Sequence, residues 1–173
     1  MTWKSYHRRG EVLRAVAAVA DERRDGRLPM DVEGVRETFA DELDLLGALQ
    51  LKWHTTFAGR IERELDEQPM DLEGAVIAAW HGVRDQMPGV RAILDHYAQH
   101  PADERMAVAF GRAVAKERMF MAAMAGRGGP MDESCIPVGA RIEEAARASC
   151  LPALRAVPER PTLLGRLRAA LAA

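Results

Sequence analysis

The sequence is poor in cysteine and has no long apolar run. Its 173 residues contain only two cysteines, Cys135 and Cys150, which excludes a disulfide framework and suits a reducing compartment. Both cysteines are predicted to be small buried residues. No run of about 18 apolar residues occurs, so no membrane-spanning helix is expected. The first residues turn basic where a signal peptide would be apolar. We expect a soluble, cytoplasmic protein with no membrane partner.

Patterns typical of β-structure and of common catalytic sites are also missing. No alternating run of β-branched residues reaches five, so strands are not predicted. There is no Walker motif, nucleophile elbow, zincin motif or Rossmann fingerprint. Neighbouring carboxylates such as Asp41 and Glu42 diverge on a helix and do not form an acid–base pair. The sequence favours a non-enzymatic protein without a cofactor.

Charge is unevenly distributed along the chain, although the net charge is only −2. Residues 31–74 hold twelve acidic and four basic side chains, whereas residues 127–173 hold seven basic and five acidic ones. That basic excess is too small for a nucleic-acid interface. Either acidic and basic helices pack side by side, or an acidic face binds a basic partner. The abundance of Ala and Arg over Lys is typical of a GC-rich bacterial genome.

The hydrophobic period is helical almost everywhere. A first helix is predicted to end near Arg24, and Asp31 is predicted to cap a long helix that continues to Asp66. Residues 28–34 are nearly repeated at 68–74, and we interpret both as helix starts. A third helix over 72–87 is followed by Pro88, where the apolar stripe resumes after a kink or a restart. A fourth helix is expected over 103–126.

These segments predict an all-α fold. We expect an antiparallel bundle of about four main helices within residues 1–126. Residues 127–173 are expected to form a C-terminal helical extension of the same domain, which packs back on the bundle. Its predicted helices are short and lie near 138–150, 152–157 and 161–172.

Histidine and aspartate residues offer one candidate metal site. His81 and Asp85 are four residues apart, as are His96 and His100, and such pairs share a helix face. Together with His54 they could bind a metal or a small molecule. The opposite interpretation is that His96 and His100 cap a helix C-terminus and that His54 is half-buried. The Glu-x-x-His pattern of ferritin-like di-iron sites is absent.

This ordered series on a helical bundle resembles the hemerythrin family in outline. The resemblance covers only His54, His81, Asp85, His96 and His100, and it implies a di-iron site with histidine and carboxylate ligands. The chain has Asp85 where the family has a glutamate, and no histidine follows His100.

A methionine-rich segment is the most unusual local composition. Met119, Phe120, Met121 and Met124 cannot all face one core, because successive helical residues diverge by about 100°. This apolar surface is expected to be covered by the C-terminal segment, by a second subunit or by another protein.

By elimination, the sequence favours a helical protein that works through protein–protein contact or self-association, in a regulatory role or as a homodimer. The rival hypothesis is a bundle that binds a metal or small molecule through the histidine and aspartate set. Trp53, Phe57 and Trp80 either fill the core or line a pocket between their helices.

Overall fold

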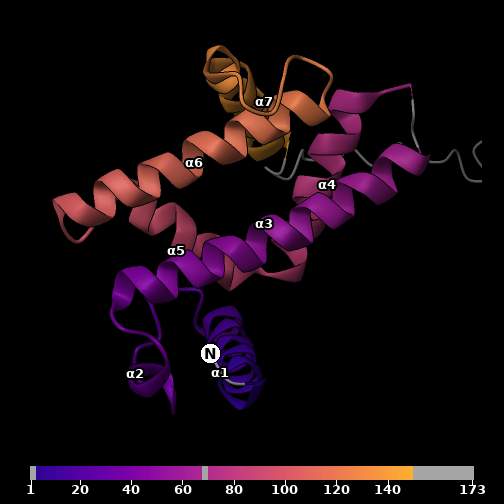
Figure 1. Ribbon diagram of the computed structural model, residues 1–173. Coiled ribbons are helices and arrows are strands. Elements are labelled where there is room, and N and C mark those ends of the chain that lie inside the picture. Colours follow the sequence, from indigo (N-terminus) through magenta and orange to yellow (C-terminus); the bar gives the residue numbers. More distant parts are fainter. Residues whose placement is uncertain (1–2, 68–69, 150–173) are drawn as a thin grey trace, which may run out of the picture.

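The computed structural model describes the backbone of residues 3–67 and 70–149, with side chains from residue 7 onward. Within these ranges the fold is all-α, and no strand is present (Figure 1). The helices are α1 (Trp3–Arg23), α2 (Val35–Thr38), α3 (Glu42–Glu67), α4 (Leu72–Gln86), α5 (Pro88–Gln99), α6 (Glu104–Met124) and α7 (Ile136–Ser149), with a 3₁₀ turn, η1 (Glu133–Cys135), before α7. The predicted fold class is therefore confirmed.

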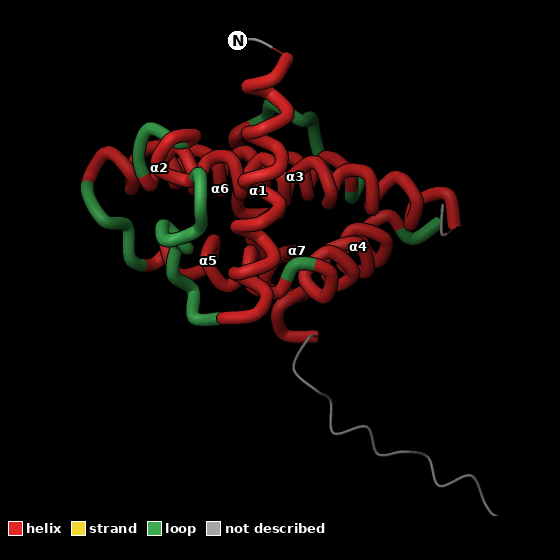
Figure 2. The backbone as a smooth tube through the Cα atoms, turned by 90° about the horizontal axis from the view of Figure 1, so that it is seen from below, coloured by secondary structure: helices red, strands yellow, loops and turns green. Residues whose placement is uncertain are grey.

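The long helices cross one another rather than forming a simple parallel stack. α3 and α6 extend across the molecule, and α1 runs across them at a steep angle (Figures 1 and 2). α3 packs mainly against α4, α6 against α7, and α1 against α5. None of the described helices is long and apolar enough to cross a lipid bilayer.

The predicted long helix over residues 31–66 is wrong. The structure instead has the short α2, an extended and buried Phe39, and then α3. Asp31 does not cap a helix, because Arg23 holds its carboxylate at 2.8 Å and lowers its pKa to about 2. Gly34, the residue just before α2, has a φ of 82°. This left-handed conformation interrupts the expected continuous helix. Asp41 is the true cap of α3 and accepts from the Asp44 backbone N–H at 2.8 Å.

The other predicted helix starts are confirmed. Asp71 accepts a 2.9 Å hydrogen bond from the Gly74 N–H, and Asp103 accepts a 2.7 Å bond from the Met106 N–H. α6 ends at Met124, and Gly126 follows its C-cap with a φ of 69°. The Arg127 N–H bonds to the Ala122 carbonyl of the last turn, which closes a Schellman motif.

Pro88 starts a new helix rather than kinking an old one. α4 ends at Gln86, and Pro88 occupies the first turn of α5, where its missing N–H is not needed. Gly89 brings this start against the end of α1: its N–H donates to Asp21 at 2.7 Å, and a Cβ on it would lie 2.0 Å from the Ala20 carbonyl. The two helices therefore meet closely only because this residue has no side chain.

The C-terminal segment packs back on the bundle as far as it is described. The helix predicted near 138–150 corresponds to α7, which packs along α6. A Cβ on Gly139 would lie only 1.9 Å from the Arg118 carbonyl oxygen, so the two backbones are in direct contact there. The helices predicted near 152–157 and 161–172 lie outside the described residues, as does Cys150. Cys135 is buried, as predicted.

Tryptophan side chains fill the core. Trp53 and Trp80 meet edge to face with ring centroids 6.2 Å apart, and Trp53 lies 6.4 Å from Phe57. All three rings are buried, which settles the choice between core and pocket in favour of the core.

Candidate functional site: a charged cleft between α5, α6 and α7

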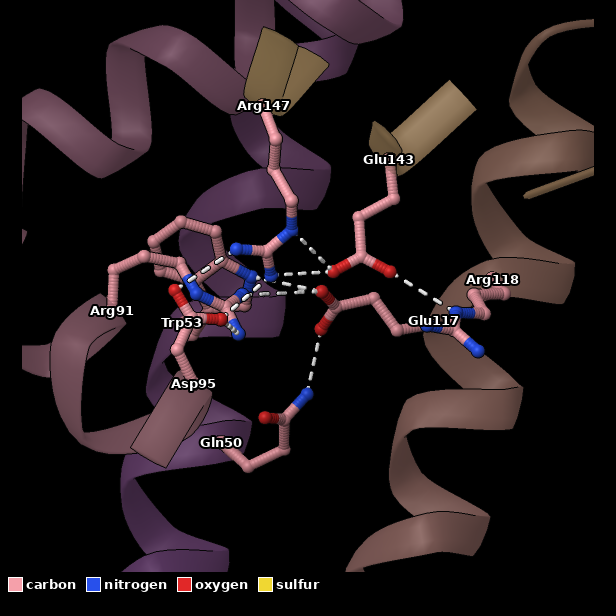
Figure 3. Close-up of polar contacts among 8 residues, drawn as sticks. All are labelled: Gln50, Trp53, Arg91, Asp95, Glu117, Arg118, Glu143 and Arg147. Carbon is pink, nitrogen blue, oxygen red and sulfur yellow. Dashed lines mark hydrogen bonds and ion pairs between the residues drawn. The ribbon is translucent and has the colours of Figure 1, made fainter. Parts of the chain in front are cut away.

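A cluster of eight polar and aromatic side chains joins four helices (Figure 3). Each helix contributes two members: Gln50 and Trp53 from α3, Arg91 and Asp95 from α5, Glu117 and Arg118 from α6, and Glu143 and Arg147 from α7. Because these helices are distant in the sequence, only the folded chain brings the charges together.

Glu117 lies deepest in this cluster. Its carboxylate accepts from Gln50 Nε2 at 2.6 Å and from Trp53 Nε1 at 3.1 Å, and Arg91 Nη1 lies 3.7 Å away. Burial raises the pKa of Glu117, and the positive charge of Arg91 only partly opposes that rise. The buried carboxyl is therefore held in place, but the site does not favour its charged form.

Arg91 is buried between this carboxyl and the Trp53 ring. Its guanidinium carbon lies 4.7 Å from the ring centroid, and Nη2 pairs with Asp95 at 2.7 Å. Its Nε is buried and has no hydrogen-bond partner among the described residues. Arg91 thus links the core to the charged residues nearer the surface.

Arg147 fastens α7 to α5. It donates to both carboxylate oxygens of Asp95, at 3.0 and 2.6 Å, and to Glu143 at 2.6 Å. Burial disfavours the ionised forms of Asp95 and Glu143, but the neighbouring arginines together outweigh it and lower the pKa of each carboxyl. Arg147 acts on both carboxyls with Arg91, and Arg118 adds to the effect at Glu143. The two carboxylates are therefore charged at neutral pH.

These charges form the floor of a cleft of about 670 Å³. The lining includes Arg91, Asp95, Arg118, Glu143 and Arg147 from the cluster, but not Glu117, which lies behind them. The apolar and small residues of the wall are Ala98, Pro101, Ala107, Phe110, Gly111, Val114, Ala115 and Ala140. A concave site with apolar walls and a few fixed polar groups is typical of small-molecule binding.

Besides Arg91, whose unpaired Nε is buried, two charged groups in the lining have unused hydrogen-bonding capacity. Arg118 donates through Nε to Glu143 at 3.0 Å, and its two terminal nitrogens have no partner in the described part of the chain. Glu144, on α7, forms no ion pair with any described residue and is exposed. The cleft therefore offers one free cationic and one free anionic group.

Gly111 keeps the cleft open on the α6 side. A Cβ built on it meets no atom within 4 Å, although glycine inside a helix costs about 1 kcal/mol relative to alanine.

No protein-family model, curated protein or solved structure matches this chain.

The histidine and aspartate residues predicted as metal ligands are dispersed, except for one pair. His96 and His100 stack with ring centroids 5.2 Å apart on the exposed end of α5. His54 is half-buried against the Phe120 ring, and Asp85 pairs with its neighbour Arg84. No three His, Cys, Asp or Glu side chains are placed to hold a metal ion within residues 3–67 and 70–149.

His81 contributes to the packing of α7. Its Nε2 lies 2.8 Å from the Ala146 carbonyl oxygen, and since a carbonyl only accepts, this nitrogen is the donor. Ser149 Oγ lies 3.2 Å from the same nitrogen. The side chain is thus committed to holding the last described turn of α7.

Most of the predicted methionine surface is covered by the chain itself. Met119 and Met121 are buried, while Phe120 and Met124 are half-buried against the core. α6 packs against α7 and α3, and the Phe120 ring contacts His54 and Phe57 of α3, so other helices of the same chain supply the cover. These four side chains do not form an exposed apolar face.

The sequence analysis missed the charged cluster, although one signal for it was present. The inward stripe of α6 runs through Phe110, Val114, Met121 and Met124, and Glu117 occupies the position between the middle two. A carboxylate on an apolar stripe indicates a buried polar partner. The cluster residues on α3, α5 and α7 have no comparable signal in the sequence around them.

Proposed function

We propose that this protein binds a small molecule in the cleft between α5, α6 and α7. The observation that carries the proposal is a cavity of about 670 Å³ whose floor is a fixed network of arginine and carboxylate groups. This volume lies within the range of roughly 300–1,000 Å³ that is usual for ligand sites. The proposal is for binding, since most charged groups of the lining are paired with one another and Glu117, whose pKa burial raises, does not line the cavity.

The free groups of the cleft fit a small zwitterion with an apolar side. The terminal nitrogens of Arg118 suit a carboxylate, since a guanidinium fork donates two parallel hydrogen bonds to one. Glu144 offers its unpaired carboxylate to an ammonium group. Phe110 and Val114 would contact the apolar remainder of the ligand. A free amino acid with an aliphatic or aromatic side chain has this combination.

The buried part of the cluster would act by preorganisation. Arg147 holds Asp95 and Glu143, and Glu143 in turn accepts from Arg118 Nε, so the orientation of Arg118 is fixed before a ligand arrives. A binding group that needs no reordering loses less conformational entropy on binding. The other charged groups of the lining neutralise one another, so ligand selection by charge depends on Arg118 and Glu144.

Thermal unfolding in the presence of each standard amino acid tests this proposal. Ligand at 100 times its Kd stabilises the folded state by about 2.7 kcal/mol, so binding raises the unfolding midpoint. We expect the largest rise with apolar amino acids, a smaller rise with the methyl ester of leucine, which lacks the carboxylate, and none with glycine. Equal midpoints throughout the panel would contradict the proposal.

Protein–protein contact, the function favoured by the sequence, has lost its main support. It rested on an apolar face of α6, and Met119 and Met121 of that face are buried within the chain. The homodimer expected from the sequence depended on the same face, and the molar mass in solution tests it. A metal site likewise stays a prediction, limited to the stacked pair of His96 and His100.

A further inference from the structure

A second cavity lies on the other side of α6. It is a groove of about 990 Å³ between α1, α3 and α6. Phe110 lines both cavities. The apolar and small lining residues of the groove are Gly10, Leu13, Leu43, Gly47, Ala48, Leu51, Ala109, Phe110 and Ala113. Leu51 lies at its edge and is 63% exposed.

Positive charge gathers at the groove without a matching negative charge. Among the described residues of the lining, Asp44 is the only acidic one, and it is paired with Arg9 at 2.7 Å. Arg14 and Lys52, on opposite walls, form no ion pair with any described residue. Arg14 Nη1 lies 3.8 Å from the position of a Cβ on Gly10, so its guanidinium reaches over the groove wall.

Two glycines leave room in the walls. A Cβ built on Gly47 meets no atom within 4 Å, and Gly47 lies in the middle of α3, where a larger residue would favour the helix. Gly10 is the corresponding small residue on α1. The groove is therefore open along its length between the two lone cations.

We propose that this groove is a binding site for a single-chain fatty acid in its free form. An apolar channel with cations at its edge complements one carboxylate head and one hydrocarbon tail. A peptide fits less well, because most of the exposed lining of the groove is apolar and would leave many polar groups of a peptide backbone without partners. The tail would contact Leu13, Leu43 and Leu51, and the carboxylate would pair with Lys52 or Arg14. This site is separate from the cleft proposed above and does not depend on it.

Isothermal titration of the full chain with dodecanoate, below its micelle concentration, tests the proposal. We expect one molecule bound per chain. Gly47→Leu places a side chain inside the groove and should weaken binding by about tenfold or more. Gly59→Leu is the matched control: it lies on the same helix, has equally open space around it and lines neither cavity. Its affinity should equal that of the unchanged chain.

The head-group requirement is tested with a charge reversal. Lys52→Glu should weaken dodecanoate binding by about tenfold, while Lys116→Glu, on the exposed side of α6 and outside both cavities, should not. Dodecanol, which lacks the carboxylate, should bind the unchanged chain more weakly than dodecanoate does.

Three results would overturn the proposal. The first is dodecanoate binding that is unaffected by Gly47→Leu. The second is uptake of many molecules per chain without saturation, as expected of non-specific adsorption. The third is binding to phosphatidylglycerol vesicles through Lys52 and Leu51 with no affinity for free dodecanoate, which would make the groove a membrane contact.

Discussion

Gln50 Nε2 donates a 2.6 Å hydrogen bond to Glu117 Oε2, and this bond connects the surroundings of the two cavities. Gln50 lines the groove between α1, α3 and α6. Glu117 lies behind the charged floor of the cleft on the other side of α6, 3.7 Å from Arg91. A buried carboxyl therefore lies between two candidate binding sites, in contact with the lining of each.

The raised pKa of Glu117 predicts how the stability effect of replacing this residue changes with pH. Because burial raises this pKa above its usual value of 4.5, the folded state binds the proton more tightly than the unfolded state, and the carboxyl costs stability as pH rises through the folded value. Glu117→Gln is nearly isosteric and stays neutral. We expect its free energy of unfolding, relative to the unchanged chain, to increase as pH rises above about 4.5, the usual value of the carboxyl. Urea unfolding at several pH values measures it, and a difference that falls with pH would contradict the assignment.

The ion pairs of Arg147 should make stability depend on pH with the opposite sign. The pKa values of Asp95 and Glu143 are lowered in the folded state, so their contribution to stability is present at neutral pH and lost as pH falls through those values. Arg147→Met leaves both carboxylates without this partner. Because the Arg147 side chain is 38% exposed, solvent screening limits the expected loss to about 1–3 kcal/mol at neutral pH.

The loss of stability caused by Arg147→Met should become smaller at acidic pH, because protonated Asp95 and Glu143 carry no charge to pair with the arginine. The same unfolding series measures it. Arg141→Met, an exposed position of the same helix that lines neither cavity, is the control and should change stability by less than about 0.5 kcal/mol. A deficit of Arg147→Met that is constant with pH would show that packing, not charge, explains it.

Two glycines of the α6–α7 region should respond to alanine in opposite directions. Gly111→Ala adds a methyl group in open space inside a helix and should stabilise the fold by about 0.5–1 kcal/mol. Gly139→Ala would place its Cβ 1.9 Å from the Arg118 carbonyl oxygen, so α7 must move away, at a cost of about 2 kcal/mol or more. Chemical unfolding of the two variants checks both signs. Equal effects would contradict the close contact of α6 with α7.

The burial of the α6 methionines within one chain predicts that the protein is a monomer in dilute solution. Because Met119 and Met121 are buried by the chain's own helices, we expect light scattering of the dilute protein to give a mass near 19.1 kDa. A mass near twice that value would show that another surface joins two copies. The exposed first half of α6, which includes Val108, would then be the first segment to test by Val108→Glu.

Local sequence signals predicted most of the helices and their caps. Asp71 and Asp103 cap as expected because their carboxylates meet only the backbone N–H groups that follow them. The nearly identical segment at Asp31 behaves differently because Arg23, eight residues earlier, takes its carboxylate. This competing ion pair depends on a residue outside the repeated segment, so the near identity of residues 28–34 and 68–74 does not reveal it.

The candidate site was much less predictable than the fold. The cleft depends on Arg147 reaching Asp95 across 52 positions and on Glu117 meeting Gln50 across 67. Neither pair follows a helical spacing, so no periodicity reveals it. The histidine pairs attracted attention because their spacing of four is local, yet only His96 and His100 come together. The spacing of residues on one helix predicts a shared face and says nothing about the helix opposite.

The affinity of the cleft for leucine tests the central claim most directly. Isothermal titration of the unchanged chain should show one leucine bound per chain. Gly111→Leu, whose side chain would occupy the cleft, should abolish that heat, while Gly47→Leu and Gly59→Leu should retain it. Saturable binding that survives Gly111→Leu, or no binding by the unchanged chain at millimolar leucine, would contradict a ligand site between α5, α6 and α7.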